Sequence, residues 1–195
     1  RYESSAASDV YKRQALATGN TVVAKPSEIT PMTAYLLSKI CKEINFPKGV
    51  LNIIHGRGEK LGDALTTHQD VPIVSFTGGS DTGKHISKVT APYFKKLSLE
   101  LGGKNPNIIF DDCDFDNAVS TASRAAFTNQ GQICLCGSRV FVQNKIYEKF
   151  KSALVDKAKK LIVGDPKNSN SHLGAVVSEE HMNKILLKIN EAKKL

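Results

Sequence analysis

The sequence predicts an α/β protein built on parallel strands, because short apolar runs alternate with amphipathic segments. Three β-branched, apolar runs lie at residues 21–24, 50–54 and 71–76, and helical patterns separate them. Strands and helices that alternate at this spacing predict right-handed strand–helix–strand units with parallel strands. A glycine-rich turn, residues 77–83, joins the third run to the next helical segment.

The first predicted helix begins at Pro31, because proline suits the first helical position. Its apolar residues recur at helical spacing, so we expect the helix to bury one face, formed by Leu37, Ile40, Cys41 and Ile44. Further helices are predicted over residues 59–67 and 81–89. The glycine-rich turn before the last of these can hold a phosphate, because free N–H groups and the helix dipole attract an anion. It lacks the G-x-G-x-x-G pattern, and a tight turn without a ligand has the same composition.

The second half of the chain continues the same alternation. Apolar runs at residues 97–101 and 107–110 flank a glycine pair, which we interpret as a hinge between two domains. A helix capped within residues 111–116 runs to residue 127. A strand over 139–143 and helices over 146–161 and 179–192 complete the prediction. The expected organisation is a cofactor-type half at residues 15–101 and a second α/β half at 102–195.

Residues 1–14 differ in composition from the rest of the chain. They are polar and rich in serine and alanine, with neither strand alternation nor a helical apolar stripe. We expect this segment to be disordered, or to be a foreign beginning. The chain also ends at residue 195 without a helix cap, which we interpret as a cut end.

The composition excludes several classes of protein. With 195 residues, 41% hydrophobic and 24% charged, the chain matches an ordinary soluble globular protein. It contains no apolar run long enough for a transmembrane helix and no secretory leader, so we expect a cytoplasmic protein without a membrane partner. The net charge is +8, but the lysines are dispersed and no basic run carries interleaved aromatics. We therefore expect no nucleic-acid partner.

The four cysteines do not predict a metal site. They form no C-x-x-C pair, and no histidine lies at zinc-ligand spacing from them. Cys41 falls on an apolar helix position, and Cys113 lies among aspartates that oppose a thiolate.

Cys134 is the candidate nucleophile, because it follows a glycine-containing turn where backbone N–H groups can stabilise a thiolate. Upstream, Glu100 lies at the end of a short apolar run, before the glycine pair Gly102-Gly103. A carboxylate near such a cysteine can act as the base that activates water. Cys136 can be a bystander or helper, or can resolve an oxidised Cys134; we favour the first interpretation because the alternative closes a strained ring.

Several segments resemble the NAD(P)-dependent aldehyde dehydrogenase superfamily. Leu-Glu-Leu-Gly-Gly-Lys-Asn-Pro (99–106) is similar to its glutamate signature, and Phe-Thr-Asn-Gln-Gly-Gln-Ile-Cys (127–134) to its cysteine signature. Ala-Leu-Ala-Thr-Gly-Asn (15–20), Val-Ala-Lys-Pro-Ser-Glu (23–28) and the turn beginning Phe-Thr-Gly (76–83) resemble its cofactor-binding half. The resemblance runs from residue 15 to the end of the chain.

The resemblance implies a partial Rossmann-type NAD-binding domain followed by part of an α/β catalytic domain. It implies that Cys134 attacks an aldehyde to form a thiohemiacetal and then a thioester, and that Glu100 activates the water that releases the acid. Glu28 favours NAD over NADP, because a 2′-phosphate would meet a like charge. The residues that the resemblance assigns to the cofactor are Lys25, Pro26, Ser27, Glu28, Gly58, Phe76, Thr77, Gly78, Gly79, Gly83, Leu101 and Gly102.

The segments 103–106 and 133–136 look most like the branch that oxidises 2-aminomuconic and related muconic semialdehydes. The resemblance thus implies a small-molecule aldehyde substrate and, for the full-length form, a homo-oligomer.

The chain departs from the family pattern at both ends. The family carries a Pro-Trp-Asn segment upstream, whose asparagine completes the oxyanion hole, but this sequence has no tryptophan. The downstream segment that grips the nicotinamide ribose and the C-terminal assembly strand are not found either. We therefore expect an incomplete chain that is not active by itself. The alternative is a truncated, non-catalytic paralogue that binds NAD or a partner subunit.

Overall fold

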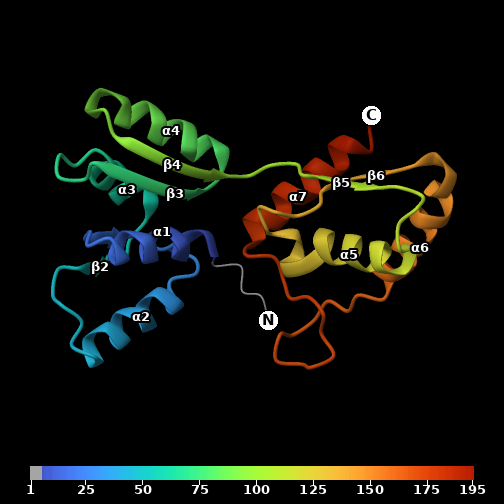
Figure 1. Cartoon of the computed structure of the whole chain (residues 1–195), viewed down its shortest axis with the longest axis horizontal. Helices are drawn as coiled ribbons and strands as arrows, with labels where there is room; N and C mark the ends of the chain where they lie inside the picture. The colour runs from blue at the N-terminus through green and yellow to red at the C-terminus, as the bar shows by residue number, and fades with distance from the viewer. Residues whose placement is uncertain (1–5) are drawn as a thin grey trace. The chain divides into compact units, whose positions relative to one another are not determined.

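The computed structural model describes residues 6–195 and divides into two compact units, with the sequence boundary between Gly102 and Gly103. The elements of the first unit are α1 (Ala6–Ala17), β1 (Val22–Ala24), α2 (Met32–Glu43), β2 (Leu51–Ile53), α3 (Gly58–Thr66), β3 (Ile73–Gly78), α4 (Ser80–Thr90), a 3₁₀ turn (Ala91–Tyr93) and β4 (Lys96–Leu101) (Figure 1). The second unit contains β5 (Pro106–Ile109), α5 (Phe115–Phe127), a 3₁₀ segment (Thr128–Gly131), β6 (Arg139–Val142), a 3₁₀ turn (Asn144–Ile146), α6 (Tyr147–Lys159) and α7 (Glu179–Ala192). Within residues 6–195, no helix combines the length and apolar character needed to cross a membrane.

Every strand pair in the described part of the chain is parallel. β1 pairs with β2, β3 with β4, and β5 with β6, and a helix lies between the two strands of each pair in the sequence. Parallel neighbours need such a crossover, since a tight hairpin can join only antiparallel strands. The predicted α/β class with parallel strands is therefore confirmed. The first three strands do not form one continuous sheet, because β3 pairs with β4 instead of β2.

In the first unit, α4 packs on the β3–β4 pair (Figure 1). Val74 of β3 and Ile86 of α4 are buried there. Gly83 permits the close approach, since a Cβ at this position would lie 2.7 Å from a methyl group of Leu101. The glycine thus serves the packing of α4 against β4.

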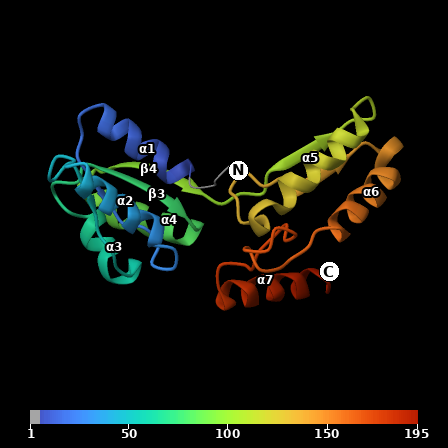
Figure 2. The ribbon, with the colours of Figure 1, turned by 90° about the horizontal axis from the view of Figure 1, so that it is seen from below.

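The second unit has its own core, formed by Ile109, Val119, Ala122 and Phe150. Phe150 is fully buried and meets Phe115 edge to face, with ring centroids 6.0 Å apart. The helices that supply these residues, α5 and α6, lie side by side (Figure 2). α5 begins at the N-cap Asp114, whose carboxylate accepts from the Asn117 N–H at 3.2 Å, so the predicted cap within 111–116 is confirmed.

The structure differs from the expectation at the beginning of the chain. Residues 1–5 lie outside the described residues, but Ala6–Ala17 form helix α1 where disorder was predicted to residue 14. The segment has no apolar stripe, but its alanine, lysine, arginine and glutamine residues favour a helix through intrinsic propensity. Contacts of α1 with β1 and β3 add tertiary support.

The predicted burial of one face of α2 is wrong. No residue of Met32–Glu43 is buried, and Ile40 and the following Ile44 are 51% and 64% exposed. Leu37 and Cys41 are only half-buried. The apolar stripe is present, but the chief contact of α2 is the three-residue strand β2, which is too short to cover it.

Candidate functional site

A cluster of polar groups forms where β1 and β2 end. The ammonium of Lys25 donates to the Pro26 carbonyl at 2.9 Å, to the Gly56 carbonyl at 3.3 Å and to the Glu28 carboxylate at 3.3 Å. The other carboxylate oxygen of Glu28 accepts from the Gly58 N–H at 3.4 Å. The parallel register, with Ala24 opposite Ile53, brings these residues to one edge, the carboxyl ends of the two strands. We call Lys25, Glu28 and Gly58 the Lys25–Glu28 cluster.

The surroundings of Glu28 keep its carboxylate ionised. Its own backbone N–H, the Gly58 N–H and the Lys25 ammonium hold its pKa below the ordinary value of 4.5. A lowered pKa means that these contacts stabilise the folded protein above pH 4.5 and are lost as the pH falls through the lowered value. The cluster therefore presents a fixed negative charge next to a fixed positive one at neutral pH.

The glycine-rich turn leaves the N-terminus of α4 open. Gly79 is the N-cap residue, no side chain caps the helix, and a Cβ at Gly79 would meet nothing within 4 Å. The first N–H groups of α4 thus have space for an anion. By contrast, Gly78 lies against the ring of Phe76, and Gly83 lies against Leu101.

Glu100 lies on β4, opposite Thr77 of β3. Its carboxylate accepts a hydrogen bond from the Tyr11 hydroxyl at 2.7 Å. The sequence did not indicate Tyr11, because this residue belongs to the segment expected to be disordered or foreign. Two further predicted cofactor residues contact none of these side chains. The hydroxyl of Ser27 accepts a hydrogen bond from the nearby Ile29 N–H, and Gly102 is exposed.

Cys134 lies in the second unit, on a loop that we call the cysteine loop (residues 129–137). The loop begins with three successive residues at positive φ, Asn129 at 50°, Gln130 at 58° and Gly131 at 75°. Such a run is costly for residues other than glycine and reverses the chain directly after α5. At the far end, the buried Gly137 donates its N–H to the Ala125 carbonyl at 3.1 Å, which returns the loop to α5.

Cys134 occupies a tight turn within the cysteine loop. The Cys136 N–H donates to the Ile133 carbonyl at 3.1 Å, and Cys134 is exposed while Cys136 is half-buried. The side-chain amide of Asn105 donates to the carbonyls of Cys134 at 2.7 Å and Cys136 at 3.0 Å. Asn105 belongs to the segment that resembles the family's glutamate signature, but the resemblance implied no role for it. The position of Asn105 could have indicated a role, because it lies directly before β5, and β5 pairs with β6, the strand that follows the cysteine loop.

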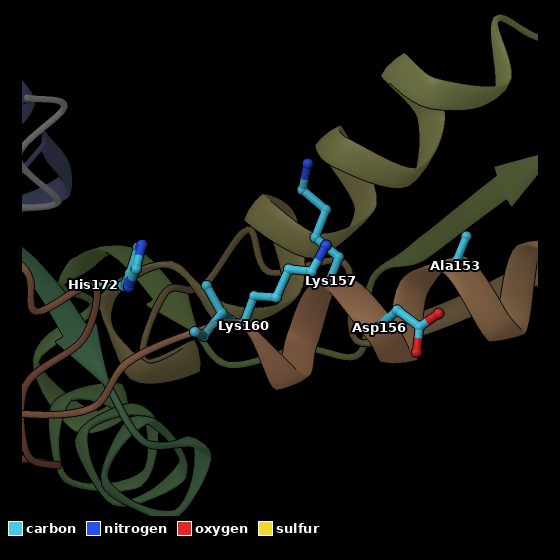
Figure 3. A pocket seen from close by; sticks show the side chains of 6 residues that line it. Ala153, Asp156, Lys157, Lys160 and His172 are labelled. Carbon is cyan, nitrogen blue, oxygen red and sulfur yellow. The ribbon is translucent and has the colours of Figure 1, made fainter.

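A pocket of about 410 Å³ lies at the C-terminal end of α6 (Figure 3). Lys157 donates to the Ser120 hydroxyl at 3.0 Å, and His172 accepts from the Ile162 N–H at 3.0 Å. None of the predicted site residues lines this pocket, whose walls are Ala153, Asp156, Lys157, Lys160, Leu161 and His172. Across residues 6–195, no group of three or more His, Cys, Asp or Glu side chains is arranged to hold a metal ion.

Comparisons with known proteins link both units to one family. The profile of the aldehyde dehydrogenase family matches residues 12–195. Over 171 residues the chain is 49% identical to 2-aminomuconic semialdehyde dehydrogenase of Danio rerio, a match that covers 88% of this chain and 35% of the relative. It is 46% identical to cytosolic aldehyde dehydrogenase 1 of Mus musculus, over 92% of this chain and 36% of the relative.

A solved structure supports the same family relationship. Betaine aldehyde dehydrogenase of Staphylococcus aureus in complex with NAD⁺ matches with a TM-score of 0.89 and 48% identity, over 92% of this chain and 36% of that chain. The present chain spans about a third of the length of the curated relatives it matches.

Proposed function

The chain belongs to the aldehyde dehydrogenase family, and we propose that the protein containing it oxidises an aldehyde to a carboxylic acid with NAD as the hydride acceptor. The observation that carries this proposal is the exposed Cys134 on a constrained, glycine-containing loop within the matched region. We assign Cys134 the role of nucleophile and Glu100 that of general base. Both assignments derive from the two signature segments that contain these residues.

The relatives favour a muconic-type semialdehyde as the substrate. Proteins that are 45% to 49% identical to this chain carry the name 2-aminomuconic semialdehyde dehydrogenase. Betaine aldehyde dehydrogenases match at similar identity, so a substrate panel must include betaine aldehyde. Mouse cytosolic aldehyde dehydrogenase supports the proposal of a cytoplasmic location.

The first unit has groups that suit the nucleotide. An ammonium next to an ionised carboxylate fits a ribose diol, because Lys25 can donate to one hydroxyl oxygen and Glu28 can accept from a hydroxyl. The negative charge of Glu28 opposes a 2′-phosphate and so favours NAD over NADP. The open N-terminus of α4 provides N–H groups for the pyrophosphate. When bound, NAD would supply the hydride acceptor.

In the second unit, the Cys134 thiolate would begin the reaction. It adds to the aldehyde carbon, an S–C bond forms, and the carbonyl electrons move to the oxygen. The Cys134 backbone N–H is a donor for this oxyanion. Loss of hydride from the same carbon leaves a thioester. Water then attacks the thioester as Glu100 takes its proton, the S–C bond breaks, and the acid and the thiolate are released.

The test is the NAD-dependent oxidation of aldehydes by the full-length protein. We expect NADH absorbance to rise with 2-hydroxymuconic semialdehyde, betaine aldehyde or acetaldehyde, with the highest kcat/KM for the muconic substrate. In Glu100→Gln, the first turnover should remain while steady-state kcat falls by about 10²- to 10⁴-fold, since thioester hydrolysis loses its base.

Two results would contradict the proposal. If NAD binds and none of the aldehydes is oxidised, the protein is a non-catalytic NAD-binding paralogue. If Glu100→Gln turns over at the wild-type rate, aldehyde oxidation stands and the role of Glu100 is wrong.

A further inference from the structure

We infer that Asn105 is a positioning residue, which orients the Cys134 thiol and backbone N–H for attack on the aldehyde. This inference rests on the proposed function, because it concerns the nucleophile of that reaction. It adds a residue whose side chain need not touch the substrate. Its basis is the pair of hydrogen bonds that the Asn105 amide makes to the cysteine loop.

The two bonds come from one nitrogen atom. Nδ2 of Asn105 donates to the Cys134 carbonyl at 2.7 Å and to the Cys136 carbonyl at 3.0 Å. An amide nitrogen carries two hydrogens, so both bonds can form at once. The Asn105 side chain therefore bridges the carbonyl groups of Cys134 and Cys136 within the turn.

The bond to the Cys134 carbonyl holds one of the two peptide planes that flank the Cys134 Cα. The preceding plane contains the Ile133 carbonyl, which accepts from the Cys136 N–H at 3.1 Å, and it also carries the Cys134 N–H. The following plane contains the Cys134 carbonyl, which Asn105 holds. With both planes held, the two backbone dihedrals of Cys134 are restricted. The directions of its N–H and its Cα–Cβ bond are then set before the substrate binds.

The second bond holds the exit of the turn. The Cys136 carbonyl shares a peptide plane with the Gly137 N–H, which donates to the Ala125 carbonyl at 3.1 Å. A Cβ at Gly137 would lie 3.4 Å from the β-carbons of Ala125 and Asn107, so the backbone passes close to both α5 and β5.

Asn105 is itself fixed by the fold. Asn105 directly precedes β5, and its backbone carbonyl accepts at 3.1 Å from the N–H of Arg139, the first residue of the paired strand β6. The guanidinium of Arg139 also donates to the Lys104 carbonyl at 2.9 Å. Asn105 is half-buried, whereas Cys134 is exposed. The side-chain hydrogen bonds of Asn105 thus connect the residue directly before β5 to an exposed loop, which is the arrangement that a positioning residue needs.

The experiment compares Asn105→Ala and Asn105→Asp with wild type in the full-length protein. Acylation by p-nitrophenyl acetate reports the thiol directly, since the burst amplitude counts competent nucleophiles and its rate constant measures their attack. NADH formation with betaine aldehyde and 2-hydroxymuconic semialdehyde gives kcat and KM.

We expect Asn105→Ala to keep the burst amplitude while its acylation rate constant and kcat fall by about 10- to 100-fold, with KM for NAD unchanged. Asn105→Asp should lose at least as much, because a side chain of the same size then presents only acceptors to two carbonyl oxygens.

Asn52→Ala is the matched control. The Asn52 amide also donates to two carbonyls, those of Gly49 at 2.8 Å and Val22 at 3.4 Å, but in the first unit. This variant should lower the thermal unfolding temperature by an amount similar to Asn105→Ala and retain the wild-type acylation rate constant.

The outcomes separate the inference from the proposed function. If Asn105→Ala acylates at the wild-type rate, the positioning role alone is overturned. The same holds if its burst amplitude falls only in proportion to the amount of folded protein. A wild-type protein that neither reacts with the ester nor oxidises the aldehydes overturns the proposed function and the inference together.

Discussion

The Lys25–Glu28 cluster and the cysteine loop hold their key groups in opposite ways. In the cluster, charged side chains contact one another and backbone groups at the ends of two paired strands. In the cysteine loop, the backbone carries the constraint, with three successive residues at positive φ and an amide that bridges two carbonyls. The cluster presents charge, whereas the loop holds the backbone around the exposed Cys134.

This difference suits two kinds of task. A pair of opposite charges gives strong but adjustable hydrogen bonds, which fits the binding of a ribose diol. A nucleophile must instead be aimed, and a misplacement of about 1 Å can cost about 10²-fold in rate. We therefore expect changes in the loop to alter kcat and changes in the cluster to alter NAD binding.

The largest effect is expected from Cys134→Ala. Removing the proposed nucleophile should lower kcat by at least about 10⁴-fold in the full-length protein. The Kd for NAD, measured by calorimetry, should stay within about twofold of wild type, because the proposed ribose groups lie in the first unit. A variant that kept more than a hundredth of wild-type turnover would show that Cys134 is not the nucleophile.

Gly131→Ala should have an intermediate effect. Gly131 has a φ of 75°, and an added Cβ would lie 3.3 Å from the Ala126 carbonyl oxygen. A side chain at positive φ costs about 1–2 kcal/mol, so the loop should relax and kcat should fall about tenfold.

Gly49→Ala is its control, since Gly49 has a φ of 82° and lies outside the proposed site. It should lower the free energy of unfolding by a similar amount without changing kcat. Equal losses of kcat in the two glycine variants would mean that the strain in the cysteine loop has no particular function.

Glu28→Gln should have the smallest effect and should act on binding. The neutral amide should raise the Kd for NAD by about fivefold to tenfold with kcat unchanged, as expected for an interaction made equally in ground and transition states. The preference for NAD over NADP should shrink in the same variant, since the like charge that opposes a 2′-phosphate is gone.

The pH dependence tests the same residue. Because the pKa of Glu28 is lowered from 4.5, the Kd for NAD in wild type should be flat above pH 4.5 and should rise only as the pH falls through the lowered value. Glu28→Gln should lack this acid limb. An acid limb of equal size in both proteins would assign it to another group.

Local patterns in the sequence predicted most elements of the fold. The helix predicted over 179–192 is confirmed as α7, and the end predicted at residue 127 is confirmed for α5, because periodicity and caps act over a few residues. Two expectations differ from the structure. Helix α1 forms where disorder or a foreign beginning was expected, because intrinsic propensity favours a helix without an apolar stripe. The apolar stripe of α2 is not buried, since the sequence does not reveal how little packs on that helix.

The sequence alone determined which chemical groups the protein contains and where the chain turns around them. Cys134 and Glu100 could be singled out because each lies close to glycines in a short motif, and Lys25 because its segment resembles the cofactor-binding half of the family. Tertiary structure alone decided which groups meet. The Asn105 amide reaches the Cys134 carbonyl, and Glu28 reaches the Gly58 N–H, through contacts between residues far apart in the sequence. Those contacts depend on the register of paired strands, which follows from the packing of the whole unit.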